Sequence, residues 1–226
     1  MSIPKTSDLF PAHSRRSMSS DQKRLPGRFS RLRSRVIVSD MESANTPKSV
    51  GLIQLFTGNG KGKTTAALGT AIRAVANGWK VAIVSFDKGG EHYSERRMFA
   101  DRFPEIDCFP TGLDRIDSAT GTFRFGVTDE DRREAERGLD IVRDLFVKNK
   151  HQLLVLDEIN TATGLGMLNE ADVLAVLASK PDLMELIMTG RNCPESFTHL
   201  ADLVSDVNLV KHYFYHGVPA REGLDY

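Results

Sequence analysis

The sequence predicts an α/β fold in which a mostly parallel sheet carries helices on both of its faces. From Gly51 onward, short apolar runs rich in Val, Ile and Leu alternate with segments of helical periodicity. Such alternation is typical of parallel sheets that are covered on both sides. The first apolar run leads directly into a glycine-rich loop and then a helical pattern, which is a recurrent arrangement in this fold class. A chain of 226 residues accommodates one such domain and a tail.

Six strands are expected, over residues 52–56, 80–85, 106–109, 153–156, 183–188 and 203–207. Four helices are expected, over residues 63–77, 128–150, 170–179 and 195–201. The second helix has the clearest pattern: Thr128 and Asp131 form a capping-box signature at its start. Its apolar residues recur at helical spacing between charged positions, at Ala135, Leu139, Val142, Leu145 and Phe146.

Residues 1–50 are rich in Ser, Arg, Pro and Lys and have no sustained period. They are expected to form a disordered basic N-terminal extension, which leaves 51–226 as the folded domain. Three explanations for the extension remain open: a targeting peptide, a mobile arm over the active site, or translation from an early start codon. We favour the third slightly, because a start at Met41 removes no expected strand or helix.

Charge and cysteine usage exclude several classes of protein. Nine Lys and Arg against three Asp in residues 1–40 leave 21 basic and 27 acidic residues in the remainder, a net charge of −6. An acidic body argues against general nucleic-acid binding. No apolar run approaches the roughly 18 residues of a membrane span, so a cytoplasmic protein is expected. Cys108 and Cys193 lack metal-ligand spacing and are expected to be reduced, partly buried thiols.

The glycine-rich loop indicates nucleotide binding. It reads Thr57-Gly58-Asn59-Gly60-Lys61-Gly62-Lys63-Thr64 and continues with Thr65. Glycines let backbone N–H groups converge on a phosphate, and the following helix adds about half a positive charge. Two lysines supply two full charges, so we expect them to contribute more than the helix. Only three residues, not the usual four, separate Gly58 from the Gly-Lys-Thr, which makes this a modified P-loop on a P-loop NTPase-like (RecA-like) fold.

Two further positions are expected beside this loop. Asp157 and Glu158 follow an apolar strand, so their carboxylates face the crevice at the carboxyl ends of the strands. With the hydroxyl of Thr64 or Thr65, they offer oxygen ligands to Mg²⁺; alternatively, they cap the next turn. Arg191 follows another strand and either enters the same crevice or lies in a surface turn.

With these residues in hand, the chain resembles the ATP:corrinoid adenosyltransferases. The resemblance spans about 51–226 and rests on several motifs in a fixed order. These are the stretch Phe56 to Ala67, Leu156-Asp157-Glu158, Thr189-Gly190-Arg191, Ala201-Asp202-Leu203-Val204, Val210-Lys211-His212 and Gly223-Leu224-Asp225-Tyr226.

The resemblance implies that ATP acts as an alkyl donor. Reduced cobalt, Co(I), of a corrinoid attacks the ribose 5′ carbon, and triphosphate leaves, in adenosylcobalamin biosynthesis or salvage. It implies catalytic roles for Lys63, Thr64 and Glu158, and Mg²⁺ held by Thr64, Asp157 and Glu158. The partners it implies are ATP, a corrinoid, a reductant such as a flavoprotein and a second copy of the chain, with neither nucleic acid nor membrane.

The resemblance also implies two aromatic residues that displace the lower axial ligand of the corrinoid. In the family they follow a Thr-Gly pair, but here Thr111-Gly112 is followed by Leu113-Asp114-Arg115. We therefore assign the role to Phe123 and Phe125, after an apparent insertion, with packing on the domain surface as the alternative. His212 is expected to be structural. Tyr213–Tyr215 are expected to form a packing strand, with a subunit contact as an open alternative.

Three hypotheses remain open at this point. The first is the adenosyltransferase. The second is an ATP hydrolase or phosphotransferase in which Glu158 positions water, because apolar residues ending in Asp-Glu also occur in motor-type ATPases. The third is a nucleotide-dependent corrinoid carrier without turnover. The reaction products distinguish the first two: triphosphate with an adenosyl–cobalt bond, or ADP with phosphate.

Overall fold

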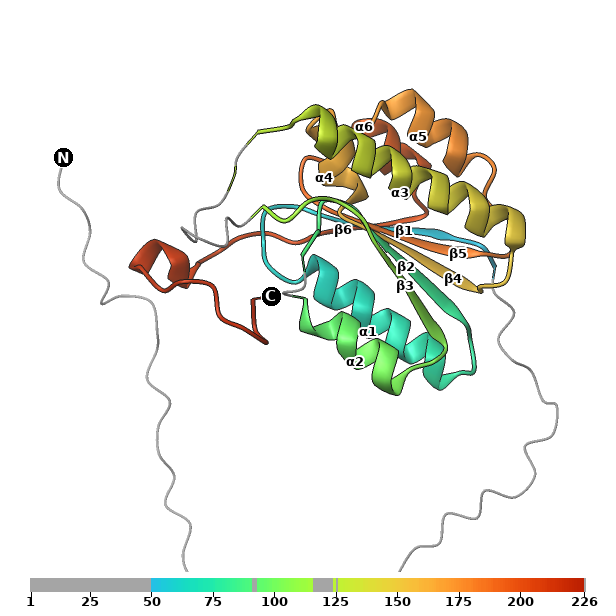
Figure 1. The fold of residues 1–226 in the computed structure, drawn as a ribbon, viewed down its shortest axis with the longest axis horizontal. Helices are drawn as coiled ribbons and strands as arrows, with labels where there is room; N and C mark the ends of the chain where they lie inside the picture. Colours follow the sequence, from blue (N-terminus) through green and yellow to red (C-terminus); the bar gives the residue numbers. More distant parts are fainter. Residues whose placement is uncertain (1–49, 91–92, 116–123, 125, 226) are drawn as a thin grey trace, which may run out of the picture. The chain divides into compact units, whose positions relative to one another are not determined.

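The computed structural model describes residues 50–90, 93–115, 124 and 126–225, which all lie in the unit Ser43–Tyr226 (Figure 1). Along the chain the elements are β1 (Ile53–Thr57), α1 (Lys63–Ala76), β2 (Val81–Ser85), α2 (Ser94–Arg102), β3 (Ile106–Pro110), α3 (Asp129–Lys148), β4 (Leu153–Asp157), α4 (Ile159–Gly164), α5 (Glu170–Leu177), β5 (Glu185–Thr189), α6 (Glu195–Leu200), β6 (Leu203–Asp206) and a 3₁₀ helix (Tyr213–His216).

The strands form one sheet in the order β3-β2-β4-β5-β1-β6. Every pairing is parallel, so all six carboxyl ends lie along the same edge. The order confirms the predicted α/β class with a parallel sheet. It also places β5 between β1 and β4, which brings the end of β5 between the glycine loop and the acidic pair.

The two faces of the sheet carry different helices. α1 and α2 cover one face, and α3, α4, α5 and α6 cover the other (Figure 1). Successive residues of β4 divide between the two layers: Leu154 and Leu156 belong to the core under α3, whereas Leu153 and Val155 belong to the core under α1. This alternation is the geometry of a strand buried on both sides, and it holds the carboxyl end of β4 in a fixed position.

Most expected elements are confirmed to within a few residues. The capping box of α3 is present, with Thr128 accepting a hydrogen bond from the Asp131 amide and Asp131 accepting one from the Thr128 amide. Two helices, α2 and α4, were not expected. The strand expected at Tyr213–Tyr215 is wrong: this segment is a 3₁₀ helix that ends at Gly217, whose φ is 79°.

The cysteines agree with the sequence-based expectation, since Cys108 and Cys193 are free and half-buried. None of the helices in the described residues combines the length and apolar character that a bilayer span requires. The disordered extension expected over 1–50 falls almost entirely outside the residues that the structure describes, as do Phe123 and Phe125.

Candidate functional site

The glycine loop lies between β1 and α1 and packs against the end of β6. The Gly60 amide donates a 2.6 Å hydrogen bond to the Val207 carbonyl. A Cβ atom on Gly60 would lie 2.6 Å from that carbonyl oxygen, and one on Gly58, whose φ is 93°, would lie 2.2 Å from Asp206 Oδ1. Both positions therefore require glycine, because a side chain would push the loop away from β6 and change its curvature.

Lys63 is folded back into the loop that precedes it. Its Nζ atom donates hydrogen bonds of 2.8 Å to the carbonyls of Gly58 and Gly60, and the residue is buried. Burial lowers the pKa of this ammonium below its ordinary value. The hydrogen-bond partners of this ammonium are neutral carbonyls, and the nearby Glu158 carboxylate raises its pKa less than burial lowers it, so an anion in the loop is stabilised there.

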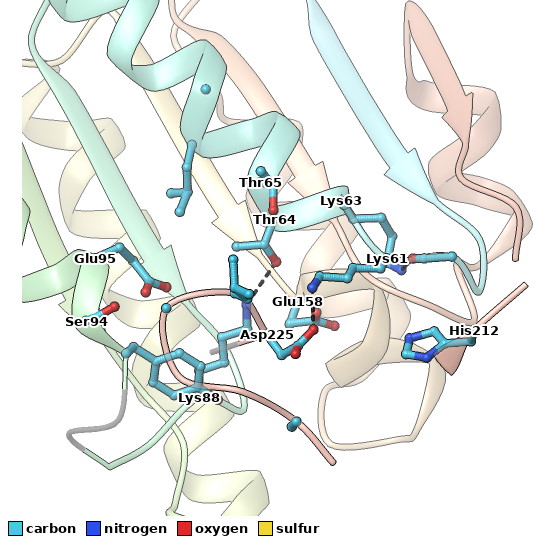
Figure 2. Close-up of a pocket in the computed structure, with 18 of the residues that line it drawn as sticks. Lys61, Lys63, Thr64, Thr65, Lys88, Ser94, Glu95, Glu158, His212 and Asp225 are labelled. Atoms are coloured by element: carbon cyan, nitrogen blue, oxygen red, sulfur yellow. Dashed lines mark hydrogen bonds and ion pairs between the residues drawn. The ribbon is translucent and has the colours of Figure 1, made fainter. Parts of the chain in front are cut away.

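Lys61 has different surroundings, since it is exposed and pairs with the C-terminal segment. Its ammonium forms an ion pair with Asp225 and donates a 3.1 Å hydrogen bond to the Tyr213 hydroxyl. The hydrogen bond to Asp225 raises the pKa of Lys61. In the close-up of the site, Lys61 and Lys63 lie in the same region as Glu158 (Figure 2). Of the two lysines, Lys63 therefore has its charge directed into the loop, and Lys61 has a carboxylate partner.

Asp157 connects four strands at the carboxyl edge of the sheet. It is only 2% exposed. Its Oδ1 accepts hydrogen bonds from the hydroxyls of Thr64, at 2.9 Å, and Thr189, at 2.6 Å. Its Oδ2 accepts a 2.5 Å hydrogen bond from the Lys88 ammonium. Thr64 lies in α1 after β1, Thr189 is the last residue of β5, and Lys88 follows β2. One buried carboxylate at the end of β4 therefore links the carboxyl ends of three other strands.

Glu158 follows immediately in a left-handed conformation, with φ of 65°. This conformation is uncommon for residues other than glycine, and here the surroundings enforce it. The Glu158 amide donates a 3.0 Å hydrogen bond to the Thr189 hydroxyl, and the Glu158 carboxylate accepts one of 2.5 Å from Thr161. The turn directs the two successive acids to different places, with Asp157 beneath Thr64 and Glu158 at the wall of the cavity.

A cavity of about 890 Å³ opens above these residues, a size suited to a nucleotide or a cofactor. Arg191 lines it, which is one of the two positions that the sequence left open, and its amide donates a 2.9 Å hydrogen bond to the Thr161 hydroxyl. The lining combines the glycine loop with residues from four other segments, namely Asn59 to Thr65, Lys88, Tyr93, Glu158, Arg191, His212, Tyr213 and Asp225.

The site offers oxygen ligands of the kind that Mg²⁺ prefers. Among the described residues, no group of three His, Cys, Asp or Glu side chains could hold a metal ion by itself. The Thr64 hydroxyl and the Asp157 carboxylate are nevertheless in contact, at 2.9 Å, and Glu158 follows in the chain. Mg²⁺ commonly uses one or two carboxylates and completes its shell with phosphate oxygens and water, so this set fits a metal that arrives with a nucleotide.

Three residues of the site were missed by the sequence analysis: Lys88, Thr189 as a partner of Asp157, and Asp225 as a partner of Lys61. Lys88 follows the carboxyl end of β2, and that position was the available signal. Its pKa is set by opposing effects: burial lowers it, but the nearby carboxylates of Asp157 and Glu158 outweigh burial and raise it. Lys88 is therefore a cation inside the site.

Comparison with known proteins agrees with this geometry. The model of the family described as ATP:corrinoid adenosyltransferase BtuR/CobO/CobP matches residues 49–226. A corrinoid adenosyltransferase of Escherichia coli K12 is 36% identical over 191 residues, which cover 83% of this chain and 91% of that protein. The corrinoid adenosyltransferase CobA of Salmonella typhimurium is 33% identical over 192 residues, with the same coverage.

Two further comparisons extend this set. A corrinoid adenosyltransferase of Pseudomonas aeruginosa is 31% identical over 196 residues, which cover 87% of this chain and 94% of that protein. Among solved structures, the flagellar accessory protein FlaH of Methanocaldococcus jannaschii overlaps with a TM-score of 0.47 and 13% identity, over 70% of this chain and 71% of that one.

Proposed function

Because the chain belongs to the ATP:corrinoid adenosyltransferase family and is itself a corrinoid adenosyltransferase, we propose that the glycine loop holds the triphosphate of ATP while the ribose faces the cavity. Co(I) of the corrinoid then attacks the 5′ carbon. The new cobalt–carbon bond uses the electron pair of Co(I), which becomes Co(III), and the pair of the broken carbon–oxygen bond leaves with the triphosphate.

The observation that carries this proposal is the environment of Lys63. Its ammonium is buried among the carbonyls of its own loop, where an arriving polyphosphate supplies the missing counter-charge. As the 5′ carbon–oxygen bond breaks, negative charge on the triphosphate grows, so Lys63 and the loop amides stabilise the transition state more than the bound substrate. Lys61 adds a second charge once the triphosphate replaces Asp225 as its partner.

Thr64, Asp157 and Glu158 are the residues that we propose hold Mg²⁺, directly or through water. When bound, the ion neutralises charge on the triphosphate oxygens. The chain's own contribution is to fix these oxygens in advance, since Thr64 and Thr189 orient the Asp157 carboxylate. A general base is unnecessary, because Co(I) is already a strong nucleophile and no proton leaves in the substitution.

For the corrinoid side of the site, we propose the roles that the family resemblance implies. Phe123 and Phe125 are assigned to displacement of the lower axial ligand, which makes the cobalt easier to reduce, and Arg191 is assigned to binding at the cavity wall. A flavoprotein reductant, a homodimer and a cytoplasmic location are likewise proposed. The choice between biosynthesis and salvage depends on which corrinoid the enzyme prefers, and an assay that compares corrinoid substrates would establish it.

Product analysis tests the proposed chemistry. The enzyme is mixed with chemically reduced cobalamin, ATP and Mg²⁺, the adenosyl–cobalt bond is followed by its absorbance, and phosphorus NMR identifies the phosphate product. We expect adenosylcobalamin and intact triphosphate in equal amounts, and neither product without the corrinoid. ADP with phosphate, formed whether or not the corrinoid is present, would instead identify an ATP hydrolase in which Glu158 positions water.

A further inference from the structure

Lys88 is held in the site by its backbone. Its amide donates a 3.1 Å hydrogen bond to the Thr111 carbonyl, and its own carbonyl accepts a hydrogen bond from the Arg96 guanidinium. The loop after β3 lies directly behind it: a Cβ on Gly112, whose φ is 100°, would lie 2.8 Å from the Lys88 amide nitrogen. The loops after β2 and β3 therefore pack backbone to backbone, which fixes the origin of the Lys88 side chain.

The side chain of Lys88 enters the region where we propose that the metal binds. It is 14% exposed, and its ammonium donates hydrogen bonds to Asp157 Oδ2, at 2.5 Å, and to Thr64 Oγ1, at 3.0 Å. A third side of the ammonium faces the Tyr93 ring, with 5.7 Å from Nζ to the ring centroid. Figure 2 shows Lys88 and Thr64 in the same cluster, with Glu158 nearby.

A metal ion and this ammonium require the same oxygens. A buried carboxylate needs a counter-charge, and in this structure Lys88 supplies it to Asp157. A divalent cation bound to Thr64 and Asp157 would be repelled by an ammonium a few ångströms away. The metal ion and the Lys88 ammonium can both remain only if Lys88 gains another anionic partner. The triphosphate can be that partner, because the cavity that Lys88 lines is also lined by the glycine loop, where we propose that the triphosphate lies.

We propose that Lys88 is a positioning residue that makes metal binding depend on the nucleotide. In the nucleotide-free enzyme its ammonium occupies the cation position between Thr64 and Asp157. When ATP binds with its metal, the ammonium moves onto the polyphosphate and releases both oxygens. This inference rests on the proposed function, because it assumes that the metal and the triphosphate share this site.

The test measures Mn²⁺ binding, with Mn²⁺ as a spectroscopic substitute for Mg²⁺. Electron paramagnetic resonance of free Mn²⁺ gives its affinity with and without ATP, and thermal unfolding with and without Mn²⁺ gives its effect on Tm. The variants are Lys88→Met, which keeps the length of the side chain without its charge, and Lys88→Arg, which keeps the charge. The double variant Lys88→Met with Asp157→Asn removes the carboxylate, and Lys150→Met changes an exposed lysine outside the site.

Without nucleotide, Lys88→Met should bind Mn²⁺ roughly tenfold more tightly than the wild-type chain, within the usual range for coupling between two sites. The increase in Mn²⁺ affinity that ATP produces should shrink by a similar factor. Mn²⁺ should also raise the Tm of this variant by several degrees, because it replaces the lost counter-charge of Asp157. Lys88→Arg and Lys150→Met should match the wild type, and the double variant should lose the Mn²⁺ effect.

Mn²⁺ affinity that is unchanged or weaker in nucleotide-free Lys88→Met would overturn the inference. If Lys88→Met is poorly folded in the presence of chelator, Mn²⁺ should restore its circular dichroism and its Tm. Failure of Mn²⁺ to restore them would also overturn the inference. A wild-type chain that binds ATP neither alone nor with Mn²⁺ would count against the proposed function instead. The two failures are distinguishable, because the Mn²⁺ affinities of the wild type and Lys88→Met are compared without nucleotide.

Discussion

The Thr64 hydroxyl donates a 2.9 Å hydrogen bond to Asp157, which lies 93 residues later in the chain. Thr64 is in the first turn of α1, which follows β1, and Asp157 is the last residue of β4. β5 lies between β1 and β4 in the sheet. The contact therefore joins the glycine loop to the acidic end of a strand two positions away.

Lys63→Ala should weaken ATP binding roughly 100-fold, which corresponds to about 2.7 kcal/mol. The variant removes the buried charge, and it also removes the two 2.8 Å hydrogen bonds that hold the carbonyls of Gly58 and Gly60. Isothermal titration calorimetry gives the affinity, and the exposed Lys150→Ala is the matched control. An affinity for ATP within about threefold of the wild type would contradict the role of Lys63.

Thr189→Val should lower the free energy of unfolding by about 1–3 kcal/mol. Thr189 is fully buried, and its hydroxyl donates to Asp157 and accepts from the Glu158 amide. Valine has a similar shape but lacks the hydroxyl, so the Asp157 carboxylate and the Glu158 amide each lose one hydrogen-bond partner. Urea unfolding measures the loss, and Thr189→Ser, which keeps the hydroxyl, should lie closer to the wild type. Equal losses in the two variants would show that the methyl group matters and the hydroxyl does not.

Asp131→Asn should destabilise the domain at pH 7 by about 1–3 kcal/mol. Hydrogen bonds from the Arg124 guanidinium, followed by those from Thr128, hold the pKa of this buried carboxyl well below its usual range. A carboxyl with a lowered pKa stabilises the folded state above its unfolded pKa, near 3.9, and this contribution is lost as the pH falls through the folded pKa.

The difference in unfolding free energy between wild type and Asp131→Asn should therefore be largest near neutral pH and should shrink below about pH 4. Urea unfolding at several pH values measures it. Asp129→Asn changes an exposed acid in the same turn, paired with Arg132 at the surface, and should have an effect below about 1 kcal/mol. A difference for Asp131→Asn that stays constant from pH 7 to pH 3 would contradict the electrostatic explanation.

Phe125→Ala should slow the reaction that starts from a Co(II) corrinoid and a reductant more than the reaction that starts from pre-formed Co(I). Displacement of the lower axial ligand assists reduction, whereas a cobalt that is already reduced no longer needs it. Stopped-flow absorbance under the two conditions gives both rates. Equal slowing in the two reactions would assign Phe125 to corrinoid binding or to packing.

Local patterns were enough to predict most of the fold. The apolar run Leu153–Leu156 predicts a buried strand from its composition alone, and the capping box of α3 is visible in Thr128 and Asp131. α2 was missed because its sequence, Ser94–Arg102, is mostly polar and only Phe99 is buried, so no apolar stripe marks a helix. The run Tyr213–Tyr215 has strand-like residues, but it forms a single 3₁₀ turn and not part of the sheet.

The candidate site was predictable where residues are contiguous and less so where the sheet assembles them. The glycine loop and Asp157-Glu158 were identified from motif and position. The contacts of Lys88 and Thr189 with Asp157 become visible only when the strand order places β2 and β5 on either side of β4. The pairing of Asp225 with Lys61 depends on how the C-terminal segment returns to the loop, which no local pattern specifies.

A crystal structure of the enzyme with ATP and Mg²⁺ would test most directly whether the glycine loop binds the triphosphate. We expect the triphosphate within hydrogen-bonding distance of Lys63 Nζ and the amides of the loop, with the ribose 5′ carbon facing the open cavity. The proposed binding mode would be contradicted if ATP bound elsewhere, the glycine loop contacted no phosphate, and Lys61 and Lys63 pointed to solvent.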